Sequence, residues 1–272
     1  MIDERLELND GRPIPRLGLG VWRADDDEAA AAVAHALGAT GYRHVDTATI
    51  YRNETGVGRG LADSGVPRDE VFLTTKVWND DIRAGRAREA LEASLERLGT
   101  DRVELALLHW PAEGRVDAWR ALLEAREAGL ARSVGVSNFL PEHLDELVAE
   151  TGEAPALNQI EHHPWLTQAP IREACERHGV AVEAWSPLMQ GRFAEAPAVG
   201  EVAAAVGRTE AQVVLRWALQ RGVVVIPKSV TPARIEENAR VFDFELDGAA
   251  MARLDALERG ERLGPDPATF SF

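Results

Sequence analysis

Two residue types that carry acid–base chemistry are scarce in this sequence. Only two of its 30 basic side chains are lysines, Lys76 and Lys228, and its only tyrosines are Tyr42 and Tyr51. Lysine is a compact point charge with an adjustable pKa, whereas arginine stays protonated. A free tyrosine has a pKa of about 10, and a cation beside it favours the phenolate and lowers that pKa. A lysine next to Tyr51 would therefore make its phenol a better proton donor near neutral pH.

Short apolar or β-branched runs recur along the chain and predict the strands that must position these residues. They span residues 17–21, 42–46, 71–76, 103–109, 132–137, 156–161, 180–185 and 223–228. Amphipathic helical stretches separate them, and glycine, which accepts the left-handed conformation, ends many of these stretches. The helix-ending glycines are Gly41, Gly99, Gly129, Gly179 and Gly222, and the candidate N-caps are Asp25, Thr209 and Asp247. Strand–helix alternation repeated about eight times predicts an α/β fold, a (β/α)8 TIM barrel.

We expect residues 1–272 to form one barrel domain, because no linker, low-complexity segment or short repeat divides the chain. An Asp-Gly turn between short alternating runs in LELNDGRPIP predicts an N-terminal β-hairpin that caps the barrel bottom. Extra helices, VGEVAAAVG and EAQVVLRWALQRG, are inserted between the seventh and eighth strands.

Polar residues at the C-terminal ends of the strands are the candidates for chemistry, because barrel active sites form there. Both lysines and Tyr51 fall on this rim, and Asp46 and His109 end two further strands. The other polar or aromatic residues at strand ends are Ser137, Asn138, Asn158, Gln159, Trp185, Ser186 and Ser229. Chance placement does not readily explain why the scarce lysines and Tyr51 all lie on this rim.

Seven motifs then occur in order: GYRHVDTATIYRNE, TTKVW, LLHWP, VGVSNF, LNQIEHHP, AWSPL and IPKSVTPARIEEN. Together they resemble the aldo-keto reductase superfamily from about residue 4 to residue 265. The resemblance is strongest to short prokaryotic members of the diketogluconate reductase type. It implies an NADPH-dependent oxidoreductase that reduces aldehydes and ketones, with Asp46, Tyr51, Lys76 and His109 as its catalytic residues.

The chemistry of these four side chains agrees with that role. Hydride addition to a carbonyl leaves an alkoxide that needs a proton, which Tyr51 would supply as general acid. Lys76 would acidify the phenol, Asp46 would hold Lys76, and His109 would hydrogen-bond the substrate oxygen. The alternatives are a purely structural Asp46–Lys76 ion pair and a core histidine at His109. Relatives that reduce a steroid C=C bond carry Glu in place of His109, so the resemblance implies action on C=O.

The resemblance also implies a cofactor site. Around the nicotinamide and pyrophosphate, Trp185 would stack on the ring, Ser137, Asn138 and Gln159 would bind the carboxamide, and Ser186 and Leu188 would line the pyrophosphate. At the adenosine end of the cofactor, the 2′-phosphate would be held by Lys228, Ser229 and Arg234. The adenine would be bound by Glu237 and Asn238. Two cations on one extra phosphate favour NADP over NAD, although Arg234 could also be an ordinary surface charge. No G-x-G-x-x-G follows the first strand, and ETGVGRG lacks the Lys-Ser/Thr of a phosphate loop.

Four large apolar residues are expected near the rim and predict a pocket for a small, partly apolar carbonyl compound: Trp22, Ile50, Trp78 and Trp110. The alternative is that one or more of these tryptophans packs under a loop. Only the short tail GERLGPDPATFSF follows the last helix. We therefore expect an open pocket with broad tolerance for aldehydes, α-keto aldehydes or keto sugars.

No metal is expected, because His162 and His163 would point apart on a strand and no other spaced ligands occur. The single cysteine, Cys175, cannot form an intramolecular disulfide and is expected to be buried and inert. The charged N-terminus and the lack of a long apolar run predict a cytoplasmic protein without a membrane span.

A net charge of −15 disfavours nucleic acid and anionic lipid as partners. A high-salt habitat and GC-rich coding are two open explanations of the composition. We expect a monomer whose partner is a small carbonyl substrate. One competing function is an NADPH-binding sensor or regulatory subunit with little turnover. Another is a barrel isomerase or aldolase, in which Lys76 would form a Schiff base.

Overall fold

The predicted strands form a closed parallel barrel in the computed structural model, which describes residue 2 and residues 4–270. Within these residues one sheet has the order β10-β9-β8-β7-β6-β5-β4-β3. Its strands are β3 (Leu19–Gly20), β4 (His44–Asp46), β5 (Phe72–Val77), β6 (Val103–Leu108), β7 (Ala131–Ser137), β8 (Leu157–Glu161), β9 (Ala181–Trp185) and β10 (Val224–Val225). Parallel bridges from Leu17 to Val225 and from Gly20 to Lys228 join the first and last strands. The predicted (β/α)8 architecture is confirmed.

The first and last strands are shorter than predicted, and the reason lies in how the barrel closes. The amides of Gly18 and Gly20 donate to the carbonyls of Val225 and Pro227, but Pro227 has no N–H with which to continue a ladder. The approach is close, because a Cβ on Gly20 would lie 2.9 Å from the Ile226 carbonyl oxygen. Closure of the barrel therefore depends on glycine at this position.

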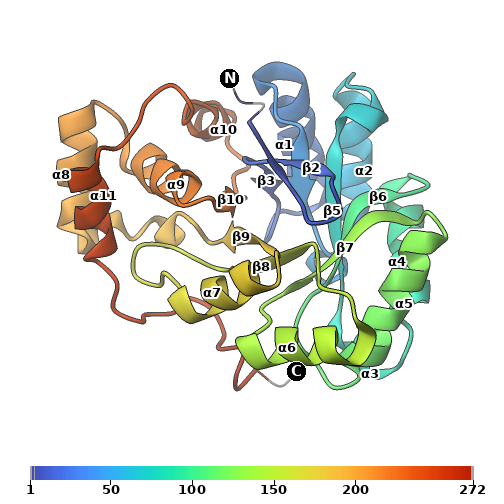
Figure 1. Ribbon diagram of the computed structural model, residues 1–272. Coiled ribbons are helices and arrows are strands. Elements are labelled where there is room, and N and C mark those ends of the chain that lie inside the picture. The colour runs from blue at the N-terminus through green and yellow to red at the C-terminus, as the bar shows by residue number, and fades with distance from the viewer. Residues whose placement is uncertain (1, 3, 271–272) are drawn as a thin grey trace.

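Helices surround the barrel as an outer layer (Figure 1). They are α1 (Asp26–Thr40), α2 (Glu54–Asp63), α3 (Asn79–Arg83), α4 (Ala87–Leu98), α5 (Arg115–Glu127), α6 (Pro141–Thr151), α7 (Ala169–Arg177), α8 (Pro197–Val206), α9 (Glu210–Gln220), α10 (Pro232–Ala239) and α11 (Gly248–Asp255). Helices α8 and α9 are the predicted insertion between the last two strands. Side-chain N-caps at Asp25, Thr209 and Asp247 are confirmed. All five predicted helix-ending glycines have positive φ.

The predicted N-terminal hairpin closes the bottom of the barrel. It pairs β1 (Arg5–Glu7) with β2 (Pro13–Pro15), and Gly11 in its turn has φ 79°. Leu8 and Ile14 pack with Phe72, Leu105 and other apolar residues in a separate buried cluster. This apolar plug leaves the opposite end of the barrel for polar chemistry.

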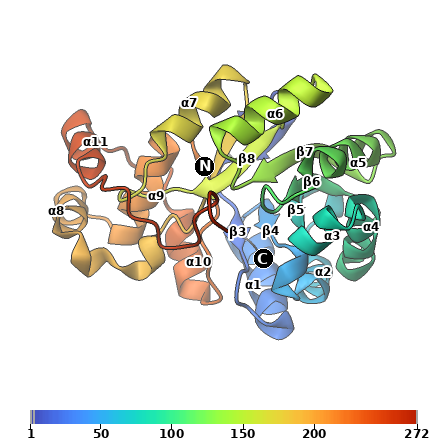
Figure 2. The same ribbon diagram turned by 90° about the horizontal axis from the view of Figure 1, so that it is seen from below.

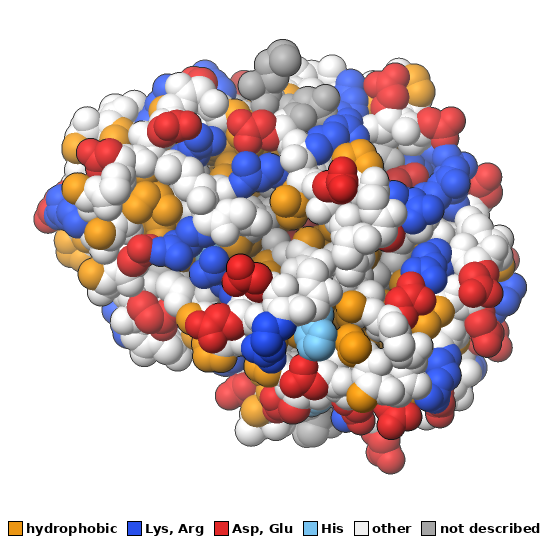
Figure 3. Space-filling model, viewed as in Figure 1, with side chains coloured by type: hydrophobic (Ala, Val, Ile, Leu, Met, Phe, Trp, Pro, Cys, Tyr) orange, Lys and Arg blue, Asp and Glu red, His pale blue; other side chains and the backbone are white. Residues whose placement is uncertain are grey.

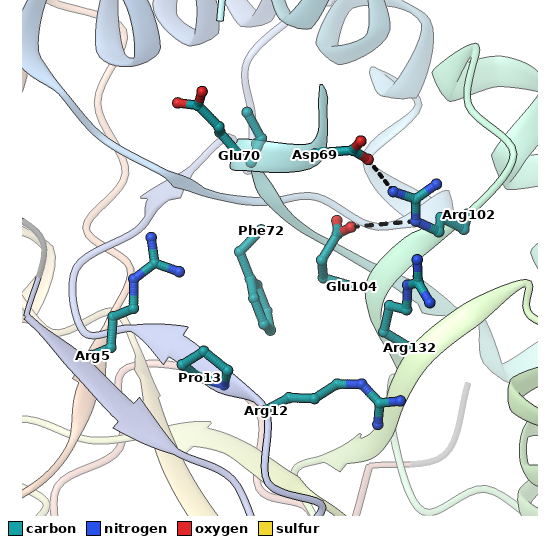
Figure 4. Close-up of a pocket in the computed structure, with 10 residues that line it drawn as sticks. Arg5, Arg12, Pro13, Asp69, Glu70, Phe72, Arg102, Glu104 and Arg132 are labelled. Carbon is teal, nitrogen blue, oxygen red and sulfur yellow. Dashed lines mark hydrogen bonds and ion pairs between the residues drawn. The ribbon is translucent and has the colours of Figure 1, made fainter. Parts of the chain in front are cut away.

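Beside the hairpin lies a depression of about 520 Å³. Figure 4 shows Arg102 pairing there with Asp69 and Glu104. Arg12, another lining residue, pairs with Asp10 at 3.0 Å. Because its lining comes from the hairpin and the N-terminal ends of the strands, this depression lies at the opposite end of the barrel from the predicted site.

The C-terminal segment leaves α11 and crosses the C-terminal ends of the strands toward the centre of the ring (Figure 2). The amides of Leu263 and Gly264 donate to the buried Glu161 carboxylate, with N–O distances of 2.6 and 3.3 Å. Further on, the ring of Phe270 stacks on Trp110 with centroids 4.0 Å apart. The short tail therefore contacts a predicted pocket residue. Its last two residues, Ser271 and Phe272, lie outside the described residues.

Acidic and basic side chains are interspersed on the face shown in Figure 3. Many form ion pairs between neighbouring helices, such as Arg115–Glu146 between α5 and α6. Over the described part of the chain, no helix is long and apolar enough to cross a membrane.

Candidate active site

The centre of the candidate site is the buried ammonium of Lys76 on β5. Its Nζ lies 2.5 Å from Oδ1 of Asp46, 2.9 Å from the Thr47 carbonyl oxygen and 3.4 Å from the Tyr51 hydroxyl. Asp46 ends β4, and Tyr51 follows on a short 3-10 helix, η1 (Thr49–Tyr51). These three acceptors use all three ammonium donors. The structure thus brings together three residues that the sequence singled out.

Burial and charge have opposite effects on the pKa values of Lys76 and Asp46. Burial alone would lower the pKa of Lys76, but attraction to Asp46 and Tyr51 outweighs it and the pKa is raised. Burial raises the pKa of Asp46, while the Lys76 charge works in the other direction. We therefore assign the pair as a carboxylate and an ammonium, because each charge is compensated by the other and by hydrogen bonds.

One expectation about Tyr51 is wrong in direction. Burial raises the pKa of the Tyr51 phenol above its ordinary value, and the nearby Lys76 charge lowers it by less. Lys76 thus limits the effect of burial instead of producing a phenol more acidic than free tyrosine. The consequence suits a proton donor, because Tyr51 keeps its proton throughout the neutral range.

His109 follows β6 and lies beside Tyr51. Its ring meets the rings of Tyr51 and Trp78 edge-on, at centroid distances of 5.8 and 5.1 Å. Burial, and then the Lys76 charge, hold the pKa of His109 well below its usual range. The imidazole is therefore neutral, which is the state that the predicted role as a hydrogen-bond donor requires. Its Nδ1 has no hydrogen-bond partner among the described residues.

Asn138 joins the strand ends around Trp185. Its Nδ2 donates to the His109 carbonyl and to the Ser137 hydroxyl, both at 3.0 Å, and its Oδ1 accepts from Nε1 of Trp185 at 2.8 Å. Ser137 in turn donates to the Gln159 carbonyl at 2.8 Å. Asn138 has φ 64°, a conformation that asparagine tolerates better than most residues. The position and orientation of the Trp185 ring are therefore fixed by hydrogen bonding.

The side chain of Gln159 lies deeper than its predicted partners. Its Nε2 donates to Oδ2 of Asp46 at 2.8 Å and to Oε1 of Glu183 at 2.6 Å. Glu183 was not among the site residues predicted from the sequence. One signal was available, because Glu183 precedes Trp185 by two residues on β9 and so shares its inward face.

The residues predicted to bind phosphate and adenine gather beyond β10. Lys228 and Arg234, the latter in the first turn of α10, are exposed, and neither forms an ion pair within the described residues. The Ser229 hydroxyl bonds to the backbone of Thr231, just before the helix.

Glu237, one of the two residues predicted to bind the adenine, accepts a hydrogen bond from the Thr209 hydroxyl at 2.9 Å. Asn238 is buried, and Ser186 and Leu188 lie in the turn after β9 with Ser186 at φ 50°.

The four predicted pocket residues differ in exposure. Trp22 and Ile50 are exposed large apolar side chains, 43% and 37% accessible. Trp78 contacts His109, whereas Trp110 is only 7% accessible and lies under Phe270. Trp110 thus shows the alternative considered for these tryptophans, a ring covered by a loop.

The remaining candidates are structural. His162 stacks on Trp217 with centroids 4.9 Å apart, while Nε2 of His163 lies 3.0 Å from Glu161. Cys175 is buried, and burial raises the pKa of its thiol to about 11. Among the described residues, no group of three or more His, Cys, Asp or Glu is placed to hold a metal ion.

Known proteins are similar to this chain over nearly its whole length. Residues 16–259 match the model of the aldo/keto reductase family. An aldo-keto reductase of Mycolicibacterium smegmatis is 51% identical over 271 residues, 98% of each chain. Methylglyoxal reductase DkgA of Salmonella typhimurium is 47% identical over 270 residues, 97% of each. The crystal structure of a Bombyx mori aldo-keto reductase in complex with NADP superposes with a TM-score of 0.91 at 34% identity, covering 97% of this chain and 96% of that one.

Proposed function

This chain belongs to the aldo/keto reductase family, and we propose that it uses NADPH to reduce small aldehydes, α-keto aldehydes and keto sugars to alcohols. The observation that carries the proposal is the Lys76 ammonium, which contacts both the Asp46 carboxylate and the Tyr51 hydroxyl. Such an arrangement is useful where a phenol must give up a proton in a buried site.

In the proposed reaction, NADPH would supply the hydride that adds to the carbonyl carbon. The neutral His109 orients the carbonyl oxygen by hydrogen bonding. Tyr51 gives its phenolic proton to the developing alkoxide, which is a much stronger base than the phenolate left behind. Lys76 stabilises that phenolate through its contact with the hydroxyl, and Asp46 keeps Lys76 charged and in place.

The residues present fit NADPH. Lys228 and Arg234 are exposed cations without ion-pair partners in the described chain, in a protein with a net charge of −15. Their convergence on a phosphate would explain why neither pairs with one of the many acids. Trp185 would stack on the nicotinamide, and Ser137, Asn138 and Gln159 would bind its carboxamide. Ser186 and Leu188 would line the pyrophosphate, with Ser229 at the 2′-phosphate and Glu237 and Asn238 at the adenine.

The substrate class rests on two observations. The exposed Trp22 and Ile50 provide apolar surface for a small carbonyl compound. The DkgA relative, named a methylglyoxal reductase, is similar over 97% of the chain. We therefore propose methylglyoxal as a first substrate to test. We also propose that residues 1–272 act as one domain and as a monomer, which light scattering after gel filtration would test.

The deciding experiment follows NADPH oxidation with methylglyoxal, for the wild type and for Tyr51→Phe. We expect kcat to fall by roughly 10²- to 10⁴-fold in the variant, the usual contribution of a general acid. NADPH affinity should be unchanged, because the substitution removes only the hydroxyl. Tight NADPH binding by the wild type without turnover of any carbonyl would instead identify a sensor. Borohydride trapping of substrate on Lys76 would identify a Schiff-base enzyme.

A further inference from the structure

Beneath the candidate catalytic residues lies a second buried acid, Glu183 on β9, whose side chain has no exposed surface. Its Oε1 accepts from Nε2 of Gln159 at 2.6 Å, and the same nitrogen donates to Oδ2 of Asp46 at 2.8 Å. One amide group thus connects the acid that holds Lys76 to an acid deeper in the barrel. Because an amide nitrogen carries two hydrogens, both contacts can be made at once.

The other oxygen of Glu183 indicates its protonation state. Oε2 has no hydrogen-bond partner among the described residues, and Nε2 of His44 lies 3.7 Å away. Nδ1 of His44 lies 3.3 Å from the Pro15 carbonyl, which only accepts, so Nδ1 carries the hydrogen. The neutral ring then presents Nε2 as an acceptor, which the Thr74 hydroxyl can also approach, at 3.3 Å. Among the described residues, Oε2 of Glu183 is therefore buried without a donor, and an ionised Glu183 would carry negative charge on an oxygen that no hydrogen bond stabilises.

The charges around Glu183 lead to the same state. It is faced by His44 and Asp46 from β4, Lys76 from β5, the uncharged Gln159 from β8, and Tyr51 from η1. Burial lowers the pKa of His44 to about 3, so that ring stays neutral. Lys76 is then the one cation in this group, and Asp46 already balances it. Burial and repulsion by Asp46 raise the pKa of Glu183 to about 8.

We propose that Glu183 acts as a neutral carboxylic acid that positions Gln159 against Asp46 and leaves the charge of Lys76 for Tyr51. Glu183 is a positioning residue, since it contacts neither the reacting atoms nor the substrate. When it ionises, a second negative charge near Lys76 raises the pKa of Tyr51 further and weakens it as a proton donor. This inference rests on the proposed reductase function, because it assigns a role toward Tyr51.

The kinetic test compares kcat and KM from about pH 6 to about pH 10 for wild type, Glu183→Gln and Glu183→Leu. Glutamine copies the neutral acid, because its oxygen can accept from Gln159 as Oε1 of Glu183 does and it carries no charge. For the wild type we expect kcat to fall near pH 8, where Glu183 ionises. The Glu183→Gln variant should keep kcat within about twofold at pH 7 and should lack this fall. Leucine removes the acceptor, which should lower kcat about fivefold at every pH, the equivalent of one hydrogen bond, with little change in KM. Glu104→Gln, at the far end of β6, is the matched control and should keep the wild-type profile.

The proposal is overturned if Glu183→Gln retains the fall near pH 8, or if Glu183→Leu matches the wild type. A readout independent of turnover is ¹³C NMR of labelled glutamate carboxyls, in which the signal absent from Glu183→Gln should titrate near pH 8. An ordinary titration of that carboxyl in an active enzyme would refute the inference alone. Titration near pH 8 in a protein that reduces no carbonyl would refute the proposed function and leave the neutral acid established. Because the NMR test uses the wild-type fold, it remains decisive if Glu183→Leu fails to fold.

Discussion

Gly264 offers a sharp test of how the C-terminal segment supports the Trp185 ring, which we propose stacks on the nicotinamide. A Cβ built on Gly264 would lie 2.9 Å from Cζ3 of Trp185 and closer still to Cη2. Ordinary contacts of a Cβ begin near 3.4 Å, so Gly264→Ala requires a movement of at least about 0.5 Å. Either the Trp185 ring or the segment must move.

Hydrogen bonds resist both movements. The Trp185 ring is held through Nε1 by Asn138 at 2.8 Å, and the segment is held by Glu161 through the amides of Leu263 and Gly264. Introducing one methyl group into a packed site destabilises it by about 1–3 kcal/mol. If that energy appears in binding, it corresponds to a roughly 5- to 150-fold increase in the Kd for NADPH. If the segment moves instead, the same energy should appear as a lower Tm.

The assay is a fluorescence titration with NADPH, combined with thermal unfolding of the same samples. Gly248→Ala is the matched control, because it makes the same change at the start of α11 with no atom within 4 Å of the new Cβ. We expect Gly264→Ala to show a higher Kd, a lower Tm or both, relative to this control. If the two variants agree in both quantities, the C-terminal segment does not support the Trp185 ring.

Two further predictions follow from the charges. Lys228→Ala should raise the Kd for NADPH about tenfold and change NADH binding little, because only NADPH carries the 2′-phosphate; equal losses for both cofactors would contradict the assignment. The second concerns stability, because the pKa of Glu183 is raised from about 4.5 to about 8 on folding. The stabilising effect of its neutral form is therefore complete below about pH 4.5 and is lost as the pH rises to about 8. Glu183→Gln should gain stability relative to the wild type between pH 5 and pH 8, on the order of a few kcal/mol in urea unfolding, whereas a constant difference would exclude the linkage.

The barrel was predictable from sequence because its strands are nearly continuous apolar runs between amphipathic helices. Strands covered on both faces require such runs, and the glycines that end the helices mark the connections. The closing strands were predicted too long, since a run such as 223–228 does not show that Pro227 and close backbone approach limit the ladder. Local pattern identified the elements, while their ends depended on contacts made only in the closed barrel.

The candidate site was predictable where it depends on strand ends, and not where it depends on distant parts of the chain. Lys76, Asp46 and Tyr51 meet because parallel strands end at the same rim. Nothing in the tail sequence indicated that Phe270 would stack on Trp110. The direction of the Tyr51 pKa was also missed, because the sequence suggests a neighbouring charge but not the degree of burial.

The presence of lysine instead of arginine has a structural explanation at one of the two lysine positions. Around Nζ of Lys76 stand three separate acceptors, from Asp46, Thr47 and Tyr51. An ammonium places three hydrogens on one atom, whereas a guanidinium spreads its donors over a planar fork that suits bidentate partners. The Lys76 side chain has no exposed surface. An arginine in its place could not reach the same three acceptors from one atom. Lys228 is exposed, and a phosphate accepts either cation, so its retention does not follow from the same geometry. We therefore expect Lys228→Arg to be tolerated where Lys76→Arg is not.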